Sequence, residues 1–174
     1  ITRRPPDQRC HAGLGRTYQI PKPFEGMTVF ENVLVGGTYG RGRSEKASYE
    51  ICARALHRAA LLPQANVLAE SLSLLERKRL ELARALATEP KVLLLDEIAG
   101  GLTEHEVLSL IETIKQLRTE GVSIIWIEHI VHALLAVVDR LMAIDFGHLI
   151  AEGDPRTGIN SPEVRDVYMG SLMV

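Results

Sequence analysis

The sequence predicts an α/β fold built on parallel core strands. Two apolar runs, 92–95 and 122–127, each lead directly into polar residues, and a helical pattern at 104–119 separates them. Strand, helix and strand in this order are typical of a parallel sheet with a crossover helix. The short, continuous apolar run at 92–95 favours a strand that is buried on both faces.

Capping signals and breakers set the expected elements in chain order. Residues 1–43 read mostly as loop, with one helical turn at 28–33, where Thr28 and Glu31 have capping-box spacing. A helix over 44–62 begins at Ser44, and another over 73–88 ends before Pro90. The later elements are a helix at 104–119 with its apolar face on Val107, Leu108, Ile111, Ile114 and Leu117, a short helix near 130–138, strands at 140–146 and 148–152 joined by a turn at Gly147, and a final helix at 161–172.

Composition excludes several classes of protein. The chain has 174 residues and a net charge of −2, so general nucleic-acid binding is not indicated. Cys10 and Cys52 lack CxxC spacing, which argues against a disulfide scaffold or zinc site and fits a reducing cytoplasm. No apolar run approaches the ~20 residues that cross a bilayer. No signal peptide is evident, and because Ile1 is not an initiator Met, we expect a longer protein.

Asp96 and Glu97 are the first candidates for chemistry. They follow the apolar run at the end of a core strand, where open α/β sheets bind ligands. One carboxylate could hold Mg²⁺ while the other positions water, as nucleotide hydrolysis requires. The alternative is that these are acids at a helix start, where they are favoured without any chemistry.

Three further residues are candidates, each with a structural alternative. His129 ends the second core strand and would lie beside Asp96 and Glu97, although it could be a hydrogen-bonded structural histidine. Ser73 forms a capping box with Glu76 at a helix N-terminus, which is also a ready anion site. Gln19 follows a Gly-containing turn and could orient water or ligate a metal, although nothing local requires it.

Together, in this order, these segments resemble the nucleotide-binding subunit of ABC transporters, and most closely the branched-chain amino acid uptake group. The matching segments are 16–19 with 23–33 for the Q-loop region, 72–86 for the signature and its helix, 92–97 for the Walker B strand, 99–102 for the D-loop, 127–129 for the switch histidine, 145–155 for the closing hairpin and 167–170 for the C-terminal helix.

The resemblance implies an incomplete P-loop NTPase domain over residues 1–174. It contains a helical and signature subdomain at about 28–90, a core from Walker B to the switch histidine at 91–160, and a C-terminal helix at 161–174. It also implies ATP and Mg²⁺ as cofactors, transporter membrane subunits and a second nucleotide-binding subunit as partners, and a cytoplasmic position on the inner face of the cell membrane.

Roles for single residues follow from the same resemblance. Asp96 would hold Mg²⁺, Glu97 would polarise the attacking water, and His129 would touch the γ-phosphate. Gln19 would sense the γ-phosphate and Mg²⁺ and couple them to the membrane subunit. Ser73 would reach across a dimer to ATP bound by the other subunit.

The chain departs from the family pattern at several places. It has no GxxxxGK[ST] phosphate loop, and we expect the strand, loop and helix that carry one to precede Ile1. In the signature, Leu75 stands where glycine is usual and Arg77 where glutamine is usual, and Ile98 replaces the usual proline after Glu97. These residues alone are expected to bind and hydrolyse ATP negligibly. The alternative functions are a non-catalytic remnant that binds partners and, less close to the pattern, an unrelated α/β phosphate-binding module.

Overall fold

The computed structural model describes residues 1–170 and the side chains of residues 1–166. The chain forms two compact units, Ile1–Ile130 and Val131–Val174, and each is described by itself. The α/β class with a parallel core sheet is confirmed in the first unit. The finer division into subdomains that the sequence suggested stays a prediction.

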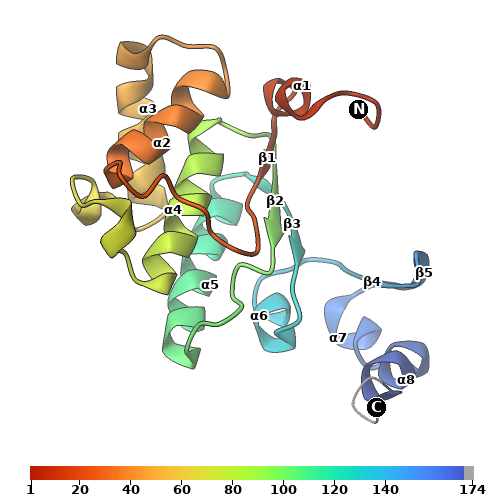
Figure 1. Ribbon diagram of the computed structural model, residues 1–174. Helices are drawn as coiled ribbons and strands as arrows, with labels where there is room; N and C mark the ends of the chain where they lie inside the picture. The colour runs from red at the N-terminus through yellow and green to blue at the C-terminus, as the bar shows by residue number, and fades with distance from the viewer. Residues whose placement is uncertain (171–174) are drawn as a thin grey trace. The chain divides into compact units, whose positions relative to one another are not determined.

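Three parallel strands form the sheet of the first unit, in the order β1 (Leu14–Arg16), β2 (Val92–Asp96) and β3 (Ser123–Ile127) (Figure 1). Helix α5 (Glu104–Thr119) connects β2 to β3, as the sequence predicted. Its capping box joins Thr103 and Glu106, and its buried apolar residues are Val107, Leu110, Ile111, Ile114 and Leu117. Leu108, which was predicted on this face, is instead 51% exposed, because a one-residue step turns the helix by about 100°.

The expectation that the core strands are buried on both faces is wrong. Leu93 and Leu95 are buried on one face, whereas Ile125 and Ile127 are 58% and 63% exposed. Successive residues of a strand point to opposite faces, so Val92 and Leu94 lie on the other face of the sheet, with Ile125, and are only half-buried. A continuous apolar run did not distinguish one covered face from two.

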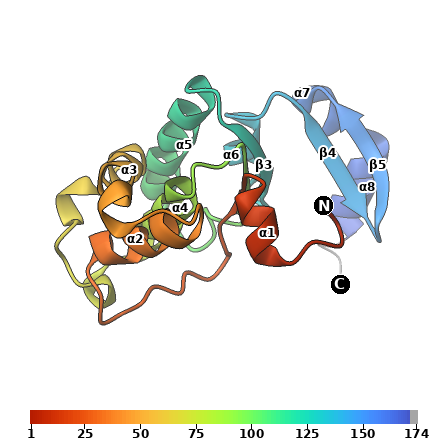
Figure 2. The ribbon, with the colours of Figure 1, turned by 90° about the horizontal axis from the view of Figure 1, so that it is seen from above.

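Helices α2 (Val29–Tyr39), α3 (Glu45–Arg58) and α4 (Leu74–Ala87) pack against one another (Figure 2). The Thr28 capping box is confirmed at the start of α2, but the helix is much longer than the predicted turn. Gly36 and Gly37 lie inside it, not in a loop. An added Cβ at Gly36 would lie 2.5 Å from the Arg84 carbonyl oxygen, so glycine permits the close approach of α2 to α4.

The remaining segments of this unit are short. Helix α1 (Pro6–His11) was not predicted; none of its residues is buried, so it has no apolar pattern to reveal it. Ser44 caps α3 as predicted, but α3 ends at Arg58 because Ala60 turns the chain with φ of +53°. Two 3₁₀ turns, η1 (Leu62–Gln64) and η2 (Ala69–Ser71), lead into α4.

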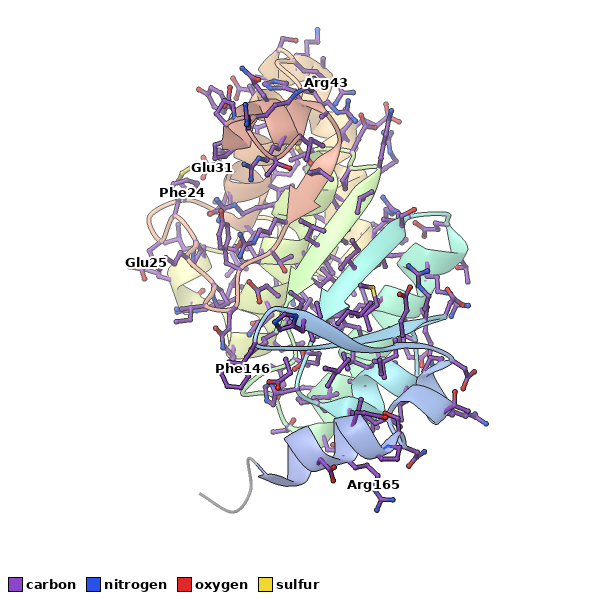
Figure 3. All side chains as sticks on the ribbon, turned by 90° about the vertical axis from the view of Figure 1, so that its right-hand side faces the viewer. Phe24, Glu25, Glu31, Arg43, Phe146 and Arg165 are labelled. Atoms are coloured by element: carbon purple, nitrogen blue, oxygen red, sulfur yellow. The ribbon has the colours of Figure 1, made fainter. Side chains whose placement is uncertain are left out.

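The second unit contains α6 (Val131–Leu135), an antiparallel hairpin of β4 (Leu141–Asp145) and β5 (His148–Gly153), and helices α7 (Pro155–Gly158) and α8 (Pro162–Gly170). Phe146 and Gly147 both have positive φ, which is typical of a two-residue hairpin turn. Phe146 is 97% exposed at this turn (Figure 3). The predicted hairpin is confirmed, and the end of the predicted last helix, 171–174, lies outside the described residues.

Candidate functional site at the strand ends

The predicted site lies where the three parallel strands end. Arg16 pairs with Leu94, and Asp96 pairs with Ile127, so the chain leaves all three strands at one edge of the sheet. Beyond the last pairs, Thr17 N donates to Leu94 O at 2.9 Å, and Glu97 N donates to Ile127 O at 2.9 Å. Parallel pairing therefore brings together segments that lie far apart in sequence.

Gln19, Glu97 and His129 come together at this edge. Gln19 Nε2 donates to Glu97 Oε2 at 2.7 Å, and His129 Nδ1 lies 3.5 Å from the same oxygen. They share an open pocket of about 380 Å³, which is lined by Gln19, Ile20, Pro21, Leu74, Lys78, Glu97, Gly100, Gly101 and His129. One carboxylate oxygen is thus the common contact of an amide and an imidazole.

Glu97 has an unusual backbone. Its φ is +43°, a value that residues with a side chain adopt rarely and at a cost of about 1–3 kcal/mol. Its carbonyl oxygen accepts hydrogen bonds from Gly100 N at 3.2 Å and from Lys78 Nζ at 3.1 Å. Such strain persists only where surrounding contacts hold it, which is common at functional sites.

Asp96 lies at the end of β2. It precedes the pocket residue Glu97 in the sequence but does not itself line the pocket. Its Oδ2 accepts from Arg16 Nη2 at 2.9 Å, and its backbone N donates to Thr17 Oγ1 at 3.3 Å. The Arg16 and Asp96 side chains are 55% and 31% exposed, so their ion pair is screened by water and holds Asp96 only loosely. The Asp96 carboxylate is a hard oxygen ligand of the kind that Mg²⁺ prefers, and Gln19 can supply a second oxygen.

Ser73 occupies a different position from the other predicted residues. It is the exposed N-cap of α4, where its hydroxyl accepts from Glu76 N and its own N–H donates to Glu76 Oε2 at 2.8 Å. The predicted capping box is confirmed. Ser73 is not in the pocket lining, whereas its neighbour Leu74 is, and Leu75 is half-buried in the first turn of α4.

Sequence reasoning missed two charged residues at this site. Lys78 is only 4% exposed, and Nζ contacts backbone from two of the converging segments. The Glu128 side chain is fully buried; its carboxylate accepts from the backbone N–H groups of Ala99, His129 and Ile130. A lysine on an amphipathic helix is usually a surface residue, so nothing in the sequence indicated that Lys78 is buried at the site. For Glu128, its place before His129 was the available signal.

A larger hollow of about 550 Å³ lies among α3, α4 and α5. Its charged groups mostly pair with one another, since Lys115 Nζ lies 2.8 Å from Glu112 Oε1, and Arg58 at its edge lies 2.6 Å from Glu120 Oε2. None of the residues with predicted chemistry lines it. The smaller pocket at the strand ends is therefore the better candidate for a reaction site.

Comparison with known proteins agrees with this geometry. Residues 2–100 match the model of the ABC transporter family. A probable branched-chain amino acid transport ATP-binding protein, LivG, of Archaeoglobus fulgidus is 34% identical over 182 residues, covering 98% of this chain and 71% of that protein. The high-affinity LivG of Escherichia coli strain K12 is 33% identical over 181 residues, covering 95% of this chain and 71% of its own length.

Solved structures show the same fold. The ADP conformation of an ATP-binding cassette from an ABC transporter superposes with a TM-score of 0.86 at 28% identity, covering 98% of this chain and 73% of that one. A nucleotide-free cassette gives a TM-score of 0.85, also at 28% identity, covering 97% and 73%. Within the described residues, no helix is long and apolar enough to cross a membrane. The chain belongs to the ABC transporter family, as one of its ATP-binding, ATP-hydrolysing subunits.

Proposed function

We propose that this chain powers an importer of branched-chain amino acids by Mg²⁺-dependent ATP hydrolysis. The substrate class is supported by the names of its relatives, which include LivG and the BraF protein of Pseudomonas aeruginosa, 33% identical over 173 residues. The observation that carries the proposal is the meeting of Gln19, Glu97 and His129 at the strand ends.

Glu97 is proposed as the group that polarises the attacking water. Its Oε2 already accepts one hydrogen bond from Gln19 Nε2, and His129 Nδ1 lies nearby. A water held by this carboxylate would be oriented and made more nucleophilic as the proton moves toward Oε2. His129 would then donate to a γ-phosphate oxygen, where negative charge accumulates during the transfer.

Asp96 and Gln19 are proposed as Mg²⁺ ligands. Mg²⁺ binds through one or two protein oxygens together with phosphate oxygens and water, and it neutralises charge on the transferring group. Asp96 fits this role because the ion pair of its side chain with Arg16 is exposed and exchangeable. Gln19 uses its amide nitrogen toward Glu97, which leaves its oxygen for a metal.

Partners are proposed from the same geometry. Ser73 lies on the exposed N-cap of α4 and outside the Glu97 pocket, which suits contact with ATP held by a second nucleotide-binding subunit. Gln19 lines this pocket, and a few residues later the chain forms the loop that carries Phe24 and Glu25, both on the protein surface (Figure 3). That loop is the proposed contact with transporter membrane subunits, and such a contact would hold the protein peripherally on the inner face of the cell membrane.

A second function, partner binding without turnover, is favoured by the signature segment. Leu74 lines the pocket, and its Cδ2 lies 3.2 Å from the position of a Cβ at Gly101; Leu75 stands at the usual glycine position. Bulky side chains at a helix N-terminus hinder close approach of a phosphate to the backbone.

The deciding experiment compares Glu97→Gln with the wild type in the full-length protein. If Glu97 acts on water, kcat falls about 10²-fold or more while ATP affinity is kept. Glu70→Gln, an exposed carboxylate on η2, is the matched control and should leave kcat unchanged. Wild-type protein that binds its membrane subunits but releases no phosphate would support the second function instead, and equal kcat in Glu97→Gln and wild type would contradict the proposed role of Glu97.

A further inference from the structure

Lys78 connects two segments of the site through a single buried ammonium group. Nζ donates to Gln19 O at 2.8 Å and to Glu97 O at 3.1 Å. The lysine comes from α4, whereas its two acceptors come from the segments after β1 and β2. Lys78 thus joins Gln19, 59 positions away in the sequence, to Glu97, 19 positions away.

Burying the charged ammonium group of Lys78 costs free energy, which its contacts must offset. Lys78 is 4% exposed, and burial lowers the pKa of its ammonium, while the nearby charges of Glu128 and Glu97 oppose that shift. A buried charge is stable only when it is paired and hydrogen-bonded, and an apolar side chain of similar length packs as well or better. The position therefore does not require lysine for packing alone.

The two acceptors are the backbones of the two residues whose side chains meet. Gln19 Nε2 and Glu97 Oε2 are 2.7 Å apart, and the Glu97 backbone has the strained φ of +43°. A hydrogen bond to Glu97 O stabilises that conformation, and the simultaneous bond to Gln19 O fixes the distance between the two main chains. A shift of the Gln19 segment would therefore pull on the ammonium and, through it, on the Glu97 peptide.

We propose that Lys78 is a positioning residue for hydrolysis, which holds the backbones of Gln19 and Glu97 together and transmits displacement of the Gln19 segment to the water-polarising carboxylate. This inference rests on the proposed function of Glu97. Lys78 acts through the two backbones and not by contact with nucleotide or water. Its predicted effect is on the chemical step, not on the affinity for ATP.

The test uses Lys78→Met, which keeps the length of the side chain and removes its donors, and Lys78→Arg, which keeps charge and donors. In the full-length protein, Lys78→Met should lower kcat about 10- to 100-fold, with KM for ATP within about twofold of wild type, because small misplacements of catalytic groups have effects of this size. Lys78→Arg should recover part of the loss. Lys46→Met, an exposed lysine on α3, is the matched control.

Hydrogen exchange provides a second measurement that does not depend on turnover. Amides in residues 17–21 and 96–101 should exchange faster together in Lys78→Met, and Lys46→Met should leave both segments unchanged. If Lys78→Met does not fold, Lys78→Gln, which keeps a shorter donor, takes its place. Unchanged kcat in a protein that hydrolyses ATP, or faster exchange in only one segment, would overturn the proposal. A wild type without ATPase activity would contradict the proposed function, while the exchange measurement would still decide whether Lys78 couples the two segments.

Discussion

Gly36→Ala tests how closely α2 approaches α4. The added Cβ would lie 2.5 Å from the Arg84 carbonyl oxygen, whereas ordinary contact begins near 3.4 Å, so the helices would have to separate by about 0.9 Å. Overpacking of this kind costs about 1–3 kcal/mol, and the backbone acceptor places it at the upper end because no side-chain rotation relieves it. Alanine returns up to about 1 kcal/mol through helix propensity. The expected net loss is about 2 kcal/mol of the free energy of unfolding.

Urea unfolding followed by Trp126 fluorescence measures this loss, because the only tryptophan of the chain lies in β3 of the first unit. Gly26→Ala is the control, since a Cβ at Gly26 meets nothing within 4 Å. The control should be neutral or more stable by about 0.4–1 kcal/mol, through its effect on the unfolded chain. If Gly36→Ala matches Gly26→Ala in stability, the close contact between α2 and α4 is not present in solution.

Three further predictions concern buried and capping groups. Burial raises the pKa of the Cys52 thiol from 9.0 to about 11, so at pH 8 a thiol reagent should modify Cys10 in the native protein and Cys52 only after unfolding. Glu128→Ala leaves three backbone N–H groups without their buried acceptor and should cost about 2–4 kcal/mol by urea unfolding; a loss below about 0.5 kcal/mol would contradict the contacts described. Hydrogen bonds from Thr103 lower the pKa of Glu106 from 4.5. Its contribution to stability is therefore complete above the unfolded pKa and is lost as the pH falls through the lower folded pKa, so the stability difference between wild type and Glu106→Gln should shrink in thermal melts below about pH 4.

Local signals predicted those elements whose ends are determined by neighbouring residues. Helix α5 has the predicted bounds because Thr103 and Glu106 cap its start and Gly121 follows its end with φ of +86°. The Phe146–Gly147 turn likewise depends on backbone conformations that a two-residue hairpin requires. In such cases the free energy that sets the boundary is contained within a few residues.

Helix α2 shows where local signals fail. A Gly-Gly pair normally weakens a helix by about 1 kcal/mol per residue, so Gly36 and Gly37 read as the end of one. Packing against α3 and α4 offsets that cost, since Val29 and Val33 are fully buried and the glycines allow the backbones to approach. Propensity was overridden by contacts between segments far apart in sequence.

The candidate site likewise contains residues that the sequence could place and one that it could not. Glu97 and His129 could be placed together from the sequence because parallel strands have a common carboxyl edge. Gln19 follows β1, which lies in a stretch that reads mostly as loop, so only the family resemblance placed it at the site. Lys78 could not be placed there, because a lysine on an amphipathic helix is solvated far more often than it is buried. Its role follows from the register of three strands and the position of α4, neither of which is encoded near residue 78.

Hydrogen bonds just beyond the strands fix the directions in which the site loops leave the sheet. Thr17 Oγ1 accepts from Asp96 N, Glu97 N donates to Ile127 O, and the Glu128 carboxylate accepts from Ala99 N. Each bond joins neighbouring strand ends, so the side chains that follow are placed before any ligand binds, which is the condition for electrostatic preorganisation. These bonds lie outside the apolar core. Substitutions that remove one of them, such as Thr17→Val, should therefore lower turnover by a larger factor than their effect on the unfolding equilibrium would predict.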